Sequence, residues 1–164
     1  MKQAYVTCIR PVVEYRYASS VWCPYKMKHI LAIEKVQRHF SRRIPALREL
    51  NYGERLALLE RDTLELRRAK SDLVLYYKIF NGLSPLSRDH YFKSISHGRP
   101  TRSQEKYLIE KPLCKSKVLE NDFFVRRIDC WNSLPIAVKN CDSVHKFRSS
   151  LSRTDLSSFL VIKV

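Results

Sequence analysis

The stretch TLELRRAKSDLVLYYKIFNG, residues 63–82, decides the fold class of this chain. Its apolar residues recur at intervals of three and four, a spacing that places them on one face of an α-helix. Asn81-Gly82 follows as a left-handed helix stop. The stretch therefore predicts a long amphipathic helix that begins at about Thr63. Its expected buried stripe consists of Leu66, Ala69, Leu73, Tyr76 and Phe80.

A basic helix is expected upstream of this stretch. Apolar residues spaced three, four and four apart share one of its faces, so this face should be buried. Pro45 should end the helix, because proline cannot continue it. The apolar face consists of Ile33, Val36, Phe40 and Ile44, and the opposite face carries Lys28, Lys35, Arg38 and Arg42.

Two further N-terminal segments favour helices. Residues 2–18 are helix-like but contain Pro11, which should kink or divide them. Residues 51–54, Asn-Tyr-Gly-Glu, resemble a capping box and predict a short helix through about Leu59.

The C-terminal part predicts two more helices. One closes before Pro135, and the last is capped by Asp142-Ser143. The apolar positions are Phe124, Ile128 and Trp131 in the first helix and Val144, Phe147 and Leu151 in the second.

These segments predict an all-α architecture. We expect a helical domain over residues 1–83, a loop-rich arm over 84–118, and a C-terminal helical extension over 119–153. Within the arm, residues 107–109 are a candidate short strand. The tail at 154–164 is apolar, and the helical pattern gives it no place.

The charge of the chain points to a polyanionic partner. Its 164 residues contain 31 Lys and Arg against 16 acids, a formal net charge of +15. With only 3 Gly the chain has neither a phosphate-binding glycine loop nor a dinucleotide fingerprint. No apolar run is long enough to span a membrane. The 5 widely spaced cysteines favour a reduced, intracellular protein of the nucleus or cytoplasm.

The sequence carries no recognisable catalytic constellation. Adjacent aspartates that could hold two metal ions are absent. Glu65 and Asp72 lie at helical spacing from Arg68, so we expect surface ion pairs there. Cys130, Cys141 and His145 are one ligand short of a structural zinc site. We therefore expect no catalytic residue, no metal and no cofactor, and we expect the cysteines to pack as small apolar residues.

The candidate nucleic-acid contacts begin on the basic face of the helix near residues 28–42. That stripe is roughly 20 Å long and can cross several backbone phosphates. The alternative is an ordinary solvated helix face. The candidate set consists of Lys28, Lys35, Arg38, Arg42 and Arg43, extended by Arg67, Arg68, Lys78, Arg126 and Arg127.

Several motifs, in order, resemble the region beyond the palm in reverse transcriptases of non-long-terminal-repeat (LINE-type, jockey-like) retrotransposons. The resemblance covers about residues 4–151. Its motifs are Ile9-Arg10-Pro11-Val12-Val13-Glu14-Tyr15, Ala18 to Pro24, Ile33 to Arg42, Leu50 to Leu56, Thr63 to Gly82, Phe124 with Arg127, Trp131-Asn132-Ser133-Leu134-Pro135, and Ser143 with Phe147-Arg148.

The resemblance implies a helical, thumb-like bundle that grips a template–primer duplex of RNA and DNA. The palm and fingers, with the catalytic aspartates and their Mg²⁺, would lie upstream, so this chain alone should be inactive as an RNA-directed DNA polymerase. No membrane and no small-molecule substrate are implied. A thumb without its palm should expose apolar side chains around Val6, Val13 and Val21. The alternatives are an independent basic nucleic-acid-binding or interaction module, and a non-functional product of a degenerate transposon.

Overall fold

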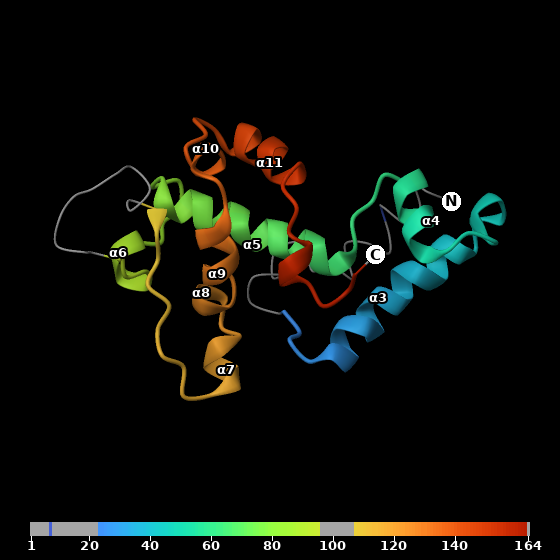
Figure 1. Cartoon of the computed structure of the whole chain (residues 1–164), viewed down its shortest axis with the longest axis horizontal. Coiled ribbons are helices and arrows are strands. Elements are labelled where there is room, and N and C mark those ends of the chain that lie inside the picture. The colour runs from blue at the N-terminus through green and yellow to red at the C-terminus, as the bar shows by residue number, and fades with distance from the viewer. Residues whose placement is uncertain (1–6, 8–22, 96–106, 164) are drawn as a thin grey trace. The chain divides into compact units, whose positions relative to one another are not determined.

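The computed structural model describes residue 7, residues 23–95 and residues 107–163 (Figure 1). The helix expected over residues 2–18, apart from residue 7, and the apolar patch expected around Val6, Val13 and Val21 lie outside the described residues. The all-α fold class is confirmed for the described part, where helices are the only regular elements apart from one isolated antiparallel bridge between Ser94 and Ile109.

The described elements follow one another along the chain as α-helices and short 3₁₀ helices, the latter labelled η. They are α3 (Met27–Arg42), η2 (Pro45–Leu47), α4 (Tyr52–Leu58), α5 (Leu64–Phe80), α6 (Arg88–Tyr91), α7 (Lys117–Glu120), α8 (Phe123–Arg126), α9 (Ile128–Ser133), α10 (Ile136–Lys139), α11 (Val144–Ser152) and η4 (Ser157–Phe159).

The described residues form two compact units. Of these residues, the first unit contains those up to Ala69 together with the tail from Ser157, and the second contains those between Lys70 and Leu156. The expected divisions after residues 83 and 118 both fall inside the second unit.

The sequence predicted the ends of α4 and α5 correctly. Asn51 caps α4 in a full capping box, in which its side chain accepts from the Glu54 N–H and the Glu54 carboxylate accepts from the Asn51 N–H. Helix α5 ends at Phe80, and Gly82, two residues later, has a φ of +66°. The Leu83 N–H then donates to the Lys78 carbonyl at 2.8 Å, which satisfies an otherwise unpaired carbonyl of the last turn.

The predicted buried face of α3 is wrong. Val36 is exposed, and Ile33, Phe40 and Ile44 are only half-buried. The buried row lies beside the predicted one and consists of Ile30, Glu34, Gln37 and Ser41. This row is buried because α3 packs against η2 and α4, where its polar side chains find hydrogen-bond partners. Hydrogen-bond partners on other elements decide which face of α3 is buried. The spacing of residues along the helix does not reveal these partners.

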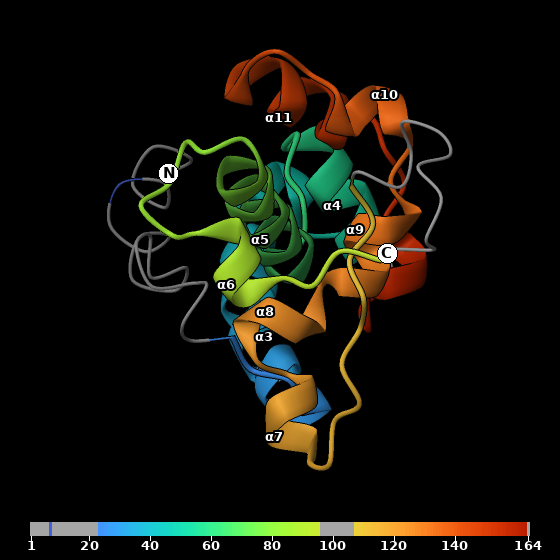
Figure 2. The same ribbon diagram turned by 90° about the vertical axis from the view of Figure 1, so that its left-hand side faces the viewer.

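An aromatic cluster forms the core of the second unit. The Tyr77 ring of α5 stacks on Phe147 of α11, with centroids 4.4 Å apart, and Tyr76 lies 5.9 Å from Trp131 of α9. Trp131 is fully buried and donates its indole N–H to the Tyr107 carbonyl at 2.8 Å. Helix α9 therefore lies beside α5, and α10 packs against α11 (Figures 1 and 2).

The two predicted C-terminal helices are present, with one difference. The helix predicted around Phe124, Ile128 and Trp131 is split at Arg127 into α8 and α9. The last helix begins as predicted, because Ser143 accepts the Lys146 N–H at 3.2 Å and caps α11.

Residues 107–109 do not form a strand, and they are part of the core rather than of a surface arm. Tyr107 and Ile109 are buried. The Asn132 side chain fixes Ile109 in place by accepting its N–H at 3.0 Å and donating to its carbonyl at 2.8 Å. The segment therefore pairs with the Asn132 amide in addition to residues 93–95, where the Glu110 N–H donates to the Lys93 carbonyl at 2.8 Å.

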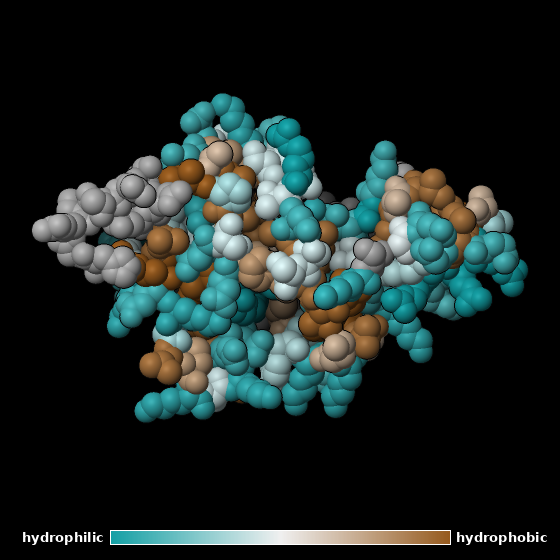
Figure 3. Space-filling view, in the orientation of Figure 1, coloured by the Kyte–Doolittle hydropathy of each residue, from teal (hydrophilic) through white to brown (hydrophobic). Residues whose placement is uncertain are grey.

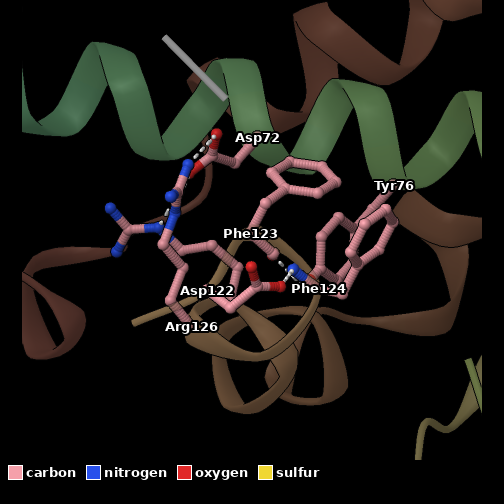
Figure 4. A network of polar contacts seen from close by, with 7 residues as sticks. Asp72, Tyr76, Asp122, Phe123, Phe124 and Arg126 are labelled. Carbon is pink, nitrogen blue, oxygen red and sulfur yellow. Dashed lines mark hydrogen bonds and ion pairs between the residues drawn. The ribbon is translucent and has the colours of Figure 1, made fainter. Parts of the chain in front are cut away.

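The expectation of surface ion pairs at Glu65 and Asp72 is also wrong. Asp72 is fully buried and accepts from Arg126 of α8 at 3.0 Å and from Arg127 at 3.3 Å (Figure 4). Glu65 is buried and accepts the N–H groups of Val161 and Ile162, at 3.0 and 2.8 Å. The Glu65 carboxylate thus anchors the apolar tail within the first unit.

Candidate nucleic-acid interface

Five basic side chains are exposed along α3 and just after it. Lys28, Lys35 and Arg42 follow at intervals of seven residues and so lie on one line of the helix. Arg38 and Arg43 lie beside this line and are also exposed. We call these five residues the α3 basic surface. Across the part of the chain that the structure describes, no carboxylate forms an ion pair with any of them.

The turn after α3 extends the α3 basic surface with arginines from two other segments. Helix α3 ends at Arg42, where cations are favoured by the helix dipole. η2 then reverses the chain and leads to Arg48, and α4 contributes Arg55. Hydrophilic side chains border this turn on the face shown in Figure 3.

Two open hollows lie around this turn. The larger has a volume of about 610 Å³ and the smaller about 390 Å³. Both are lined by Arg42, Arg48 and Glu49, to which the larger adds His39, Arg43 and Pro45 and the smaller adds Arg38, Leu50, Asn51 and Arg55. Four guanidinium groups and one carboxylate thus line the smaller hollow, so its electrostatic potential favours anions.

The Tyr52 ring positions two of these arginines. The guanidinium carbons of Arg38 and Arg55 lie 4.7 and 5.7 Å from the ring centroid, within the range of cation–π attraction. The ring is itself held through its hydroxyl, which donates to the Glu34 carboxylate and accepts from the Gln37 amide at 3.1 Å.

Glu34 connects this arrangement to the interior of the first unit. Its second oxygen accepts the N–H of Leu64, the first residue of α5, at 3.0 Å. Burial raises the pKa of Glu34 above its ordinary value, and the hydrogen bonds from Tyr52 and Leu64 and the charge of Arg68 oppose that rise only in part. Glu34 is therefore a structural acceptor beneath the basic surface rather than part of it.

Five of the ten predicted contact residues lie together on the α3 basic surface. Besides the α3 basic surface, the first unit contains Arg67, which is half-buried, and Arg68, which is buried. Lys78, half-buried, belongs to the second unit together with Arg126 and Arg127, which bind Asp72. The α3 basic surface is therefore the part of the prediction on which a function can be built.

Sequence reasoning missed Arg48 and Arg55. Neither shares a helical period with α3, because the η2 turn separates Arg48 from that helix and Arg55 belongs to α4. The one available signal was composition, since Glu49 is the only acid between Lys35 and Asn51.

No group of three or more metal-binding side chains occurs among the residues that the structure describes. Cys130 is buried, and burial raises the pKa of its thiol to about 11. In the same residues, no helix has the length and apolar character needed to cross a membrane.

Comparison with known proteins found no match to this chain among protein-family models, curated proteins or solved structures.

Proposed function

We propose that this chain is the nucleic-acid-binding, C-terminal part of a non-long-terminal-repeat retrotransposon reverse transcriptase and grips the backbone of a template–primer duplex. The observation that carries the binding half of this proposal is the α3 basic surface, whose five cations are exposed and have no carboxylate partner among the described residues. The ordered motifs that resemble those of that family support the polymerase half.

The α3 basic surface acts through phosphates. Lys28 and Arg42 stand fourteen residues apart on one helix, which corresponds to roughly 20 Å along its axis. Ammonium and guanidinium groups on such a line meet successive phosphate oxygens and release the counterions condensed there. Because phosphates are the same in every sequence, this mode of binding holds a duplex without reading its bases.

Binding is the whole contribution of this chain to the proposed reaction. The polymerase chemistry, with its aspartates and Mg²⁺, belongs to a palm encoded upstream, and the partners are that palm, the fingers and the RNA–DNA duplex. Such a protein works inside the cell, where its RNA template and DNA target are found.

The intact chain should bind an RNA–DNA template–primer duplex with an affinity that falls steeply as salt rises. Three phosphate contacts or more correspond to a slope of about −3 or steeper in log affinity against log salt. Fluorescence anisotropy with two labelled duplexes of unrelated sequence measures both properties. The two duplexes should bind within about threefold of each other, because contacts are made to the backbone. Lack of binding at 50 mM salt, or a slope near zero, would show that the α3 basic surface is a solvated helix face.

A further inference from the structure

The smaller hollow after α3 has one feature that a solvated basic face does not need. Arg55, which lines it, is only 5% exposed. Its Nε atom is buried without a hydrogen-bond partner, and no carboxylate among the described residues forms an ion pair with its guanidinium group. A buried charge without a counter-ion costs free energy, and an anion bound at Arg55 would offset that cost.

The groups around Arg55 complete an anion site. Arg38, Arg42 and Arg48 bring three more guanidinium groups to the same hollow. Arg38 and Arg55 are held in position against the Tyr52 ring, which the buried Glu34 fixes through its hydroxyl. A site in which the donors are positioned before the ligand arrives loses less entropy on binding. Planar guanidinium groups also match phosphate oxygens in pairs.

We propose that the hollow lined by Arg38, Arg42, Arg48 and Arg55 is a phosphate-binding pocket that receives one phosphate group of the bound nucleic acid. This inference rests on the proposed function for the source of the phosphate. It goes beyond that function in assigning one phosphate to a defined pocket, and in adding Arg48 and Arg55 to the contact residues. Arg55 forms the buried end of the pocket, and Arg48 its exposed side.

Inorganic phosphate is the probe for this pocket. The intact chain is titrated with sodium phosphate and, in parallel, with sodium chloride at equal ionic strength, and thermal unfolding is followed. Phosphate should raise Tm beyond the effect of chloride, with a Kd on the order of 1 mM, because a ligand that binds only the folded chain stabilises it.

Two substitutions in the pocket are compared with one control. Arg48→Gln and Arg55→Met should each weaken phosphate binding by about tenfold, the equivalent of one lost charge-assisted hydrogen bond. Arg148→Gln, an exposed arginine of α11 in the second unit, should leave it unchanged. Arg55→Met should also keep or raise the Tm measured in chloride, because it removes a buried charge without a partner. If Arg55 had a purely structural role, Arg55→Met would lower the Tm measured in chloride. If Arg55→Met fails to fold, Arg48→Gln still tests the pocket, because its side chain is exposed.

The affinities for duplexes with and without a 5′-phosphate show whether the pocket receives a phosphate at a strand end or one within the backbone. A higher affinity for the phosphorylated duplex, lost in Arg48→Gln, assigns the pocket to a strand end, and equal affinities assign it to a phosphate within the backbone. The pocket is disproved if phosphate stabilises the chain no more than chloride does, or if both pocket variants bind phosphate as the wild type does. Salt-dependent duplex binding can persist in that case, so failure of the pocket and failure of the proposed function are distinguishable.

Discussion

Replacing Asp72 by alanine will destabilise the chain by about 3–5 kcal/mol, the cost of breaking a buried ion pair by removal of one partner. The Asp72 carboxylate is fully buried on α5 and accepts from Arg126 at both of its oxygens, each at 3.0 Å (Figure 4). Arg127 adds a third contact at 3.3 Å. Without Asp72, two largely buried guanidinium groups lose their counter-charge, and the contact between α8 and α5 is reduced to Phe123, whose carbonyl accepts from the Tyr76 hydroxyl at 2.9 Å.

Asp129 provides the matched control for this substitution. It pairs with Lys111, but the two side chains are 59% and 39% exposed. Exposed pairs contribute about 0–1 kcal/mol, so Asp129→Ala should change the free energy of unfolding by no more than that. Urea denaturation of the two variants measures both values. A loss of less than about 1 kcal/mol in Asp72→Ala would contradict the description of this cluster as a buried ion pair.

Glu34→Ala is the second substitution with a large expected effect. It removes the acceptor for the hydroxyl of Tyr52, which is half-buried, and for the N–H of Leu64, which is fully buried. A buried group left without a partner costs about 1–3 kcal/mol, and the half-buried Tyr52 hydroxyl, which still accepts from Gln37, adds less, so we expect a total loss of about 2–3 kcal/mol. Urea denaturation measures this loss. Glu34→Gln keeps the size of the side chain and one acceptor, and it should lose clearly less stability than Glu34→Ala.

The wild type and Glu34→Gln together test how the stability contributed by Glu34 depends on pH. Burial raises the pKa of this carboxyl in the folded chain above the ordinary value of 4.5, so the folded state keeps a proton that the unfolded state has released. The free energy of unfolding should therefore fall as pH rises from about 4.5 through the folded-state pKa of Glu34. Glu34→Gln has no proton to lose, so the difference in stability between wild type and variant should change over this pH range. Two parallel pH profiles would contradict the raised pKa.

Local signals in the sequence predicted where helices begin and end. The Asn51–Glu54 capping box and the stop at Gly82 act between residues a few positions apart, so their chemistry can be recognised without a fold. Three of the five residues predicted as the core stripe of α5, Ala69, Leu73 and Tyr76, are fully buried, whereas Leu66 and Phe80 are half-buried.

Contacts between distant residues could not be predicted. Glu34 and Leu64 are 30 residues apart, Asp72 and Arg126 are 54 apart, and Glu65 and Ile162 are 97 apart. A carboxylate that has such partners can be buried, and nothing in its neighbouring sequence distinguishes it from one at the surface. This is why the predicted face of α3 and the predicted surface ion pairs were wrong.

For the candidate interface too, the sequence predicted the residues that share one helix but not those that other elements contribute. Residues spaced along one helix, such as Lys28, Lys35 and Arg42, share a face by geometry alone. Arg48 and Arg55 join the site only because η2 reverses the chain. The sequence does not distinguish them from Arg126 and Arg127, which the structure shows to be paired with Asp72.

The central claim is that the α3 basic surface holds nucleic-acid phosphates, and the salt dependence of duplex binding in two matched variants tests it most directly. One variant replaces Lys28, Lys35, Arg38 and Arg42 by Gln. The other replaces four exposed basic residues of the second unit, Lys115, Lys117, Arg148 and Arg153, by Gln. Both lose the same charge, and circular dichroism confirms that both stay folded. The first should lower the slope of log affinity against log salt by about two to four units, and the second should lower it by less than about one. An unchanged slope in the first variant, or an equal decrease in both, would contradict the claim.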